Sequence, residues 1–387
     1  MEFATRLSQL NTEGAFEALT RARALEAQGR QIIHLEIGEP DFETPPHVAE
    51  AGIAAIRAGK THYGPTPGLP ELREAIAAYI GRTRGVAYSP AEVIVTPGAK
   101  PIIFYVIMAL IGPGDEAIYP DPGFPIYDSV VKFAGGVPIA LPLTEEQDFR
   151  FSLDDLKARI TPRTKLLILN SPHNPCGSML TPADLMGIAE LAQKHNFWVL
   201  SDEIYSRIVY EGEFHSPAAL VGMKERTIIL DGFSKTYAMT GWRLGYGLMP
   251  EALAEQITLL MVNTTSCTAT FTQYAGVAAL NGPQTEAEAM IEEFRARRKL
   301  VVDGLNSIPG VTCRNPAGAF YAFPNVKSFG RTAKTVADYL LNEAGVACLG
   351  GASFGQYGEG YLRLSYANSR ENIEKAIEQM KVALAKF

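Results

Sequence analysis

The chain has 387 residues and is 47% hydrophobic, which is typical of a soluble globular protein large enough for two domains. Its formal net charge of −7, with no basic block, argues against general nucleic-acid binding. The longest apolar run, residues 102–111, is too short to span a bilayer, and the N-terminus has no apolar signal core. The four cysteines are widely spaced and form no metal motif or disulfide framework. These features predict a cytoplasmic protein with no metal, nucleic-acid or membrane partner.

Strand and helix patterns alternate through the middle of the chain. Residues 15–28 read as a helix that Gly29 ends. Seven apolar strand patterns follow: 92–96, 116–119, 137–141, 165–169, 198–200, 227–230 and 244–248. Strands that alternate with helices predict an α/β fold with a mainly parallel seven-stranded sheet flanked by helices. A helical pattern at residues 283–306 and strand patterns at 320–323 and 361–365 predict a smaller α+β region.

Two loops after the early strands offer ligand contacts. The first strand leads into Pro97-Gly-Ala-Lys-Pro101 and then an apolar helix. A glycine turn at a helix N-terminus presents free N–H groups to a phosphate, so Gly98, Ala99 and Lys100 are candidates. Further on, Phe124 lies between turn residues, where it stacks on a flat ring or belongs to the core.

The next two strands end in polar groups. In Ser171-Pro-His-Asn-Pro-Cys-Gly177, prolines and a glycine hold Asn174, either as a ligand contact or as a turn asparagine. The strand after it ends at Asp202, three residues before Tyr205. Ligands bind beyond the carboxyl ends of strands in α/β sheets, so Asp202 faces a pocket; the alternative is a helix cap. A carboxylate beside a pyridine nitrogen would keep that nitrogen protonated.

Lys235 lies on the loop after the strand at 227–230, and Arg243 follows eight residues later. A lone lysine is usually solvated. Here, however, the amine can form a Schiff base with an aldehyde, and the guanidinium can hold a phosphate. The cofactor with both groups is pyridoxal 5′-phosphate (PLP), an electron sink for carbanions. Near the C-terminus, Arg363 lies in an alternating strand and needs an anion, either a substrate α-carboxylate or a structural salt bridge.

In this order the motifs resemble those of the class I/II aminotransferases, within the fold-type I PLP-dependent superfamily. The resemblance begins at Ile37-Gly-Glu-Pro-Asp-Phe42, reaches the last helix, and is strongest for the aspartate and aromatic aminotransferase branch. It implies a large PLP-binding domain, residues 45–285, and a small domain built from residues 1–44 and 286–387.

The resemblance also implies roles around the cofactor ring. Lys235 is the Schiff-base lysine and the proton shuttle, and Asp202 pairs with the pyridine nitrogen. Tyr205 and Asn174 hold the phenolic oxygen, and Phe124 stacks on the ring.

For the phosphate, the resemblance implies Arg243, Ser234 and the backbone of residues 98–100. Arg363 binds the substrate α-carboxylate with Asn174 and the backbone at Gly38. Tyr63 resembles a tyrosine that reaches the phosphate of the partner subunit, which implies a homodimer with shared active sites.

Four positions bear on specificity or depart from the family pattern. Cys176 stands where threonine is usual in Asn-Pro-Thr-Gly, and Gly232 stands where some members have a phosphate-binding serine, a role Ser234 can take. Phe124 replaces a tryptophan of many aspartate-specific members. Lys100 either faces the distal carboxylate of a dicarboxylic substrate or is a phosphate or surface lysine.

The resulting hypothesis is an aminotransferase that moves an amino group from an L-amino acid of the aspartate, aromatic or broad range to a 2-oxo acid. The expected acceptor is 2-oxoglutarate, and the expected mechanism is two-step ping-pong. Two alternatives stay open: a PLP-dependent carbon–sulfur β-lyase, and a non-catalytic binding protein with the same fold.

Overall fold

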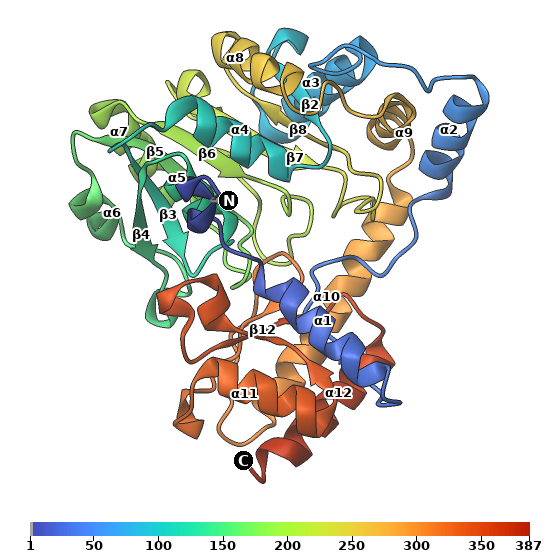
Figure 1. Ribbon diagram of the computed structural model, residues 1–387, viewed down its shortest axis with the longest axis vertical. Coiled ribbons are helices and arrows are strands. Elements are labelled where there is room, and N and C mark those ends of the chain that lie inside the picture. Colours follow the sequence, from blue (N-terminus) through green and yellow to red (C-terminus); the bar gives the residue numbers. More distant parts are fainter. Residues whose placement is uncertain (1–2) are drawn as a thin grey trace.

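A computed structural model describes residues 3–387 (Figure 1). Its centre is a seven-stranded sheet of order β2-β8-β7-β6-β5-β3-β4. Every neighbouring pair is parallel except those of β8, which runs antiparallel to β2 and to β7. The strands are β2 (Val93–Thr96), β3 (Glu116–Asp121), β4 (Val137–Pro142), β5 (Thr164–Asn170), β6 (Trp198–Asp202), β7 (Thr227–Gly232) and β8 (Gly245–Leu248).

Both faces of this sheet are buried. Successive side chains of a strand point to opposite faces, so each strand contributes to a core on either side. Ile94, Leu166 and Ile228 belong to one core, with residues of α4 (Lys100–Leu110), α5 (Ile126–Phe133) and α8 (Glu251–Val262). Their neighbours Val95 and Leu167 belong to separate clusters on the other face. The helices that supply those clusters are α3 (Pro70–Arg84), α6 (Leu153–Arg159), α7 (Pro182–His195) and α9 (Thr270–Asn281). Continuous apolar runs at β5 to β7 fit this double coverage.

The first residues pack on α5 at the level of the sheet, and the segment that follows them lies beside the C-terminal elements below the sheet in the view of Figure 1. There β1 (Ile33–His34) pairs in parallel with β10 (Val346–Ala347). A three-stranded antiparallel sheet has the order β11-β12-β9. Its strands are β9 (Tyr321–Ala322), β11 (Leu349–Gly350) and β12 (Leu362–Ser365).

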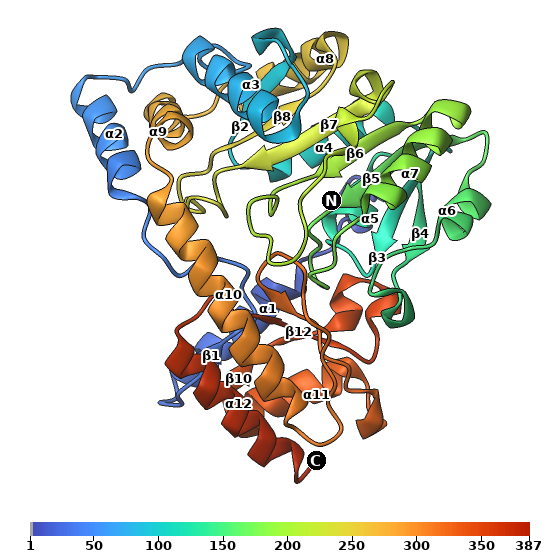
Figure 2. The same ribbon diagram turned by 180° about the vertical axis from the view of Figure 1, so that it is seen from behind.

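The remaining helices surround these small sheets or lie at the rim of the large one. The long helix α10 (Thr285–Asn306) runs from the level of the large sheet down to the C-terminal elements, where α12 (Arg370–Leu384) packs along it (Figure 2). The others are α1 (Gly14–Glu26), α2 (Pro46–Arg57), which packs on α9, and α11 (Ala333–Tyr339). No helix within residues 3–387 is both long and apolar enough to cross a membrane.

The α/β class and all seven strands expected from the sequence are confirmed. The strands reach one to two residues beyond several expected ends, so that Asn170 and Asp202 are the last residues of β5 and β6. The division into domains near residues 45 and 285 stays a prediction, with which the pairing of β1 and β10 agrees.

Candidate active site

A cavity of about 480 Å³ lies at the carboxyl ends of β3, β5, β6 and β7. The N-terminal part of α1 and the strand β12 close it from the other side. Eleven of the thirteen residues predicted for the site line it: Gly38, Ala99, Lys100, Phe124, Asn174, Asp202, Tyr205, Ser234, Lys235, Arg243 and Arg363. The fold therefore brings together motifs from nearly the whole chain at one place.

Lys235 lies on the loop between β7 and β8, and its Nζ donates to the backbone oxygen of Gly38 at 2.5 Å. Burial lowers the pKa of its ammonium to about 8, against a raising effect of Glu39. The nearby cations Arg363 and Arg243 lower this pKa further. Desolvation and like charges both disfavour the protonated amine, so part of Lys235 is a free base near neutral pH.

Asp202 is buried at the end of β6 and accepts two hydrogen bonds. The Tyr127 hydroxyl donates to its Oδ2 at 2.7 Å, and the Ile204 N–H donates to its Oδ1 at 3.3 Å. Burial raises the pKa of Asp202 to about 6, and these two donors oppose the increase. Residues 204–207 form a turn and no helix begins there, so the interpretation of Asp202 as a helix cap is wrong.

A buried ion-pair network joins the strand ends beside Asp202. Arg84, in the last turn of α3, donates from Nε to Glu203 and from Nη2 to Asp231, both at 2.8 Å. The same Nη2 lies 2.6 Å from the Ser206 hydroxyl. Glu203 follows β6, which ends at Asp202, and Asp231 lies in β7, which precedes Lys235. One guanidinium therefore fixes both strand ends.

Asn174 and Tyr205 are both buried and both line the cavity. Asn170 orients the Asn174 turn: its Oδ1 accepts the Asn174 N–H at 2.8 Å, and its Nδ2 donates to the Asp202 backbone oxygen at 3.1 Å. The Oδ1 of Asn174 is buried and makes no hydrogen bond to any residue in the described range. The hydroxyls of Tyr205 and Tyr321 lie 2.7 Å apart.

The N-terminus of α4 forms another wall of the cavity, through Ala99 and Lys100. Gly98, just before it, has a φ of +84°, and a Cβ at this position would clash with the guanidinium of Arg243. Arg243 donates to the backbone oxygens of Thr240 at 2.9 Å and Pro97 at 3.4 Å. It forms no salt bridge with any described carboxylate, so its charge is available to an anion.

Arg363, in β12, is only 4% exposed. One Nη donates to the backbone oxygen of Glu36, and the guanidinium lies 4.7 Å from the ring centroid of Tyr321 and 5.1 Å from that of Phe354. Its Nε has no hydrogen-bond partner among the described residues, and no carboxylate there pairs with it. The salt-bridge interpretation is therefore wrong. An unpaired buried charge is costly, which favours an anionic ligand at this position.

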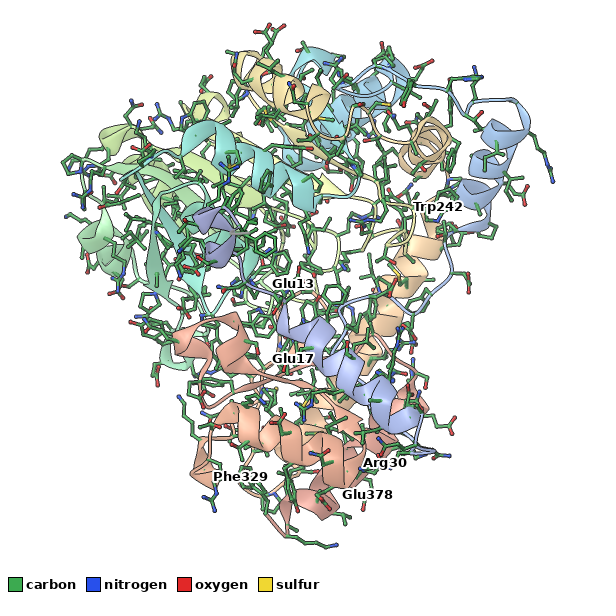
Figure 3. All side chains as sticks on the ribbon, in the orientation of Figure 1. Glu13, Glu17, Arg30, Trp242, Phe329 and Glu378 are labelled. Carbon is green, nitrogen blue, oxygen red and sulfur yellow. The ribbon has the colours of Figure 1, made fainter. Side chains whose placement is uncertain are left out.

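Lys100 forms an ion pair with Glu13, and its ammonium lies 5.2 Å from the ring centroid of Phe124. Figure 3 labels Glu13 where α1 approaches the sheet. The side chain of Lys100 thus reaches toward α1 at the edge of the cavity, where it stays partly exposed, and its contact with a substrate carboxylate stays a prediction. Phe124 also lines the cavity, and its ring meets Tyr127 edge-on at 5.9 Å.

Two predicted residues lie outside the cavity lining. Gly98 is directly behind it, against Arg243. Tyr63 is 92% exposed and does not approach the cavity of its own chain.

Among the lining residues that the sequence did not indicate, four have side chains that hydrogen-bond to predicted site residues: Glu13, Tyr127, Asn170 and Tyr321. Tyr127 lies three residues after Phe124, and Asn170 directly follows a predicted strand, so position gave a signal for both. Glu13 and Tyr321 have no comparable signal, because tertiary contacts alone bring them to the cavity.

Comparison with known proteins agrees with the geometry. The family model described as "Aminotransferase class I and II" matches residues 30–380. An aspartate aminotransferase of Pyrococcus abyssi is 43% identical over 92% of both chains. An aromatic-amino-acid aminotransferase of Thermococcus litoralis is 40% identical over 99% of this chain and 98% of its own.

A solved structure gives the same result. The aspartate aminotransferase from Thermus thermophilus with maleate superposes with a TM-score of 0.95, at 37% identity, over 99% of this chain and 100% of the other. With the family model, these relatives and the shared fold in agreement, the chain belongs to the class I and II aminotransferases and is a PLP-dependent transaminase.

Proposed function

We propose that this enzyme transfers the amino group of an L-amino acid with an acidic or aromatic side chain to 2-oxoglutarate in two half-reactions. The observation that carries the proposal is the convergence, in one cavity, of Lys235, Asp202 and two arginines that pair with no carboxylate of the described chain. A substrate with two anionic groups, or a cofactor with one, would supply the negative charge that pairs with these arginines.

The residues present fit PLP. Arg243 and the N-terminus of α4 form a cradle that a Cβ at Gly98 would fill, which suits a phosphate held by N–H groups and a guanidinium. The ionised carboxylate of Asp202 suits a protonated ring nitrogen. The side-chain Nδ2 of Asn174 and the hydroxyl of Tyr205, both in residues that line the cavity, suit the phenolic oxygen as hydrogen-bond donors. When bound, PLP supplies an electron sink for a carbanion beside an imine.

Around that cofactor, each residue has a distinct task. Lys235 Nζ, with a pKa of about 8, accepts the substrate Cα proton and returns it within the same cavity. Arg363 binds the α-carboxylate and so orients the Cα–H bond. The buried ring of Tyr321 covers one side of Arg363 and excludes water there.

The side-chain subsite supports a mixed specificity. Lys100 offers a cation to a second carboxylate, and Phe124, which is expected to stack on the cofactor ring, stands where many aspartate-specific members have a tryptophan. Relatives named for aspartate and for aromatic amino acids are about equally similar to this chain. We further propose a homodimer, in which the exposed Tyr63 of each subunit reaches the phosphate region of the other.

The experiment is a single-turnover reaction. The PLP-loaded protein is mixed with one L-amino acid at a time, without a 2-oxo acid, and its visible absorbance is followed. We expect loss of the PLP band together with one equivalent of 2-oxo acid, and recovery of the band when 2-oxoglutarate is added. The fastest donor identifies the substrate class. Lys235→Ala should abolish the reaction, whereas Lys165→Ala, at an exposed position of β5, should leave it unchanged.

A persistent visible band with continuous pyruvate release from cysteine-type substrates would instead identify a β-lyase. Normal turnover by Lys235→Ala would remove the chemical basis of the proposal altogether.

A further inference from the structure

Two tyrosines form a buried pair in the wall of the cavity. The hydroxyl oxygens of Tyr205 and Tyr321 lie 2.7 Å apart, and their rings meet edge-on with centroids 5.6 Å apart. Both side chains are almost fully buried, and both line the cavity. Tyr205 follows β6 and Tyr321 begins β9, so the hydrogen bond links the large sheet to the C-terminal elements.

A hydrogen bond between two phenols uses one of their two protons, and the other proton is free to point elsewhere. The surroundings decide which phenol donates. The Arg363 guanidinium lies 4.7 Å from the centroid of the Tyr321 ring, and a cation there stabilises the charged form of this phenol.

The pKa directions agree with that geometry. Burial raises the pKa of both phenols, and Arg363 is the main opposing influence on Tyr321 but the weakest of those acting on Tyr205. Tyr321 is therefore the stronger acid of the two and the better hydrogen-bond donor.

The Tyr321 hydroxyl is held in place by close packing. A Cβ at Gly38 would clash with this hydroxyl, so the two groups are in direct contact. The Gly38 backbone oxygen in turn accepts from Lys235 Nζ at 2.5 Å. Tyr321 thus lies next to Tyr205, to Arg363 and to the Gly38 backbone that binds Lys235.

We propose that Tyr321 is a positioning residue that donates its proton to the hydroxyl of Tyr205, so that the Tyr205 proton is directed into the cavity toward the phenolic oxygen of PLP. This inference rests on the role proposed for Tyr205. Donation from Tyr321 also strengthens Tyr205 as a donor, because hydrogen bonds in a chain polarise one another. No step of proton transfer to or from Tyr321 is required.

The test is a double-mutant cycle read by spectroscopy. The pH midpoint of the visible absorption band is measured for four PLP-loaded proteins: wild type, Tyr205→Phe, Tyr321→Phe and the double variant. A donor to the phenolic oxygen stabilises the form that has lost a proton, so a weaker donor raises the midpoint. We expect Tyr321→Phe to raise it by about half to one pH unit, the size of one buried hydrogen bond.

The double variant decides whether Tyr321 acts through Tyr205, an arrangement called the relay below, or independently of it. We expect its midpoint to equal that of Tyr205→Phe alone, because Tyr321 acts only through Tyr205. Additive shifts, or no shift in Tyr321→Phe while Tyr205→Phe does shift, would overturn the relay and leave the role of Tyr205 intact. An unchanged midpoint in Tyr205→Phe would overturn both.

Tyr366→Phe is the matched control. Tyr366 is also a fully buried tyrosine, and its hydroxyl donates to the Ala319 backbone oxygen at 3.1 Å, without a hydrogen bond to Tyr205. We expect it to lower the melting temperature of the PLP-free protein about as much as Tyr321→Phe does, with no change in the midpoint. An equal midpoint shift in this control would mean that loss of a buried hydroxyl alone causes the effect, and the relay would be wrong.

Discussion

Glu13 competes with a substrate carboxylate for Lys100 at the side-chain subsite. Both groups are partly exposed, and the pair bridges α1 and the N-terminus of α4 across the cavity wall. A substrate carboxylate that binds Lys100 must displace Glu13 or share the lysine with it. An aromatic substrate faces no such competition, because its side chain carries no charge.

Glu13→Gln should therefore favour aspartate over phenylalanine. The variant removes a negative charge that repels the second carboxylate and frees Lys100. We expect kcat/KM for aspartate to rise about two- to fivefold relative to phenylalanine, as for a partly exposed ion pair. Glu17→Gln, one turn further along α1 and exposed, is the control (Figure 3). Equal changes for both substrates would show that Glu13 does not act through charge.

His173 makes stability depend on pH. It is buried beside Asn174, its Nδ1 accepts the Cys176 N–H at 3.4 Å, and burial lowers its pKa to about 3. The unfolded chain binds a proton at this residue below its ordinary pKa of about 6.5, whereas the folded chain does not. The stabilising contribution is therefore complete above that pH and is lost as the pH falls.

His173→Asn should flatten this dependence, since the asparagine Oδ1 can accept the same N–H without titrating. Between pH 6.5 and 5, we expect the wild-type free energy of unfolding to fall by about 1.1 kcal/mol per pH unit more than that of the variant. Denaturant titrations at several pH values measure the difference, and exposed His195→Asn should behave as wild type. Parallel slopes in wild type and His173→Asn would show that another group carries the pH dependence.

At the scale of elements, apolar runs were sufficient to predict the strands but not the direction of each strand. Strands β5, β6 and β7 are buried on both faces, and their runs were recognisable for that reason. The antiparallel direction of β8 left no mark in the sequence, because a buried strand has the same pattern either way.

The candidate site, like the strands, was only partly predictable from the sequence. Residues at or shortly after strand ends, such as Asp202 and Lys235, were predictable from the rule that ligands bind there. The pairs Tyr127–Asp202 and Tyr205–Tyr321 were not, because they join residues 75 and 116 positions apart in the chain. A local pattern holds no information on such contacts.

The turn before α4 gives a prediction at this scale. Gly98→Ala places a side chain at a φ of +84° and against Arg243. We expect PLP to bind roughly tenfold more weakly, from strain of about 1–2 kcal/mol and displacement of the guanidinium. Gly59→Ala is a matched control, because its φ of +72° imposes similar strain while no atom lies within 4 Å of the added Cβ. Equal loss of PLP affinity in both variants would mean that backbone strain, not the cradle, is responsible.

At the scale of the whole molecule, the exposed Tyr63 makes the proposed dimer testable. If it serves the partner's site, a mixture of Lys235→Ala and Tyr63→Ala subunits, refolded together, forms dimers with one intact site. That site combines Lys235 of one subunit with Tyr63 of the other, so we expect activity to return on mixing. A doubly substituted chain mixed with wild type serves as the control. Failure to recover activity, or an active monomer in sedimentation experiments, would contradict the exchange of tyrosines.

The position of Arg363 in the chain has a consequence for biosynthesis. Asn174, Asp202 and Lys235 all leave the ribosome before β9 and β12, and β1 must wait for β10. The part of the cavity that fits PLP is therefore synthesised before the arginine expected to bind the substrate α-carboxylate. We expect ribosome-bound chains arrested after α9 to capture PLP, as measured by fluorescence, while amino acids leave that signal unchanged. The enzyme would then acquire its cofactor before it can recognise a substrate.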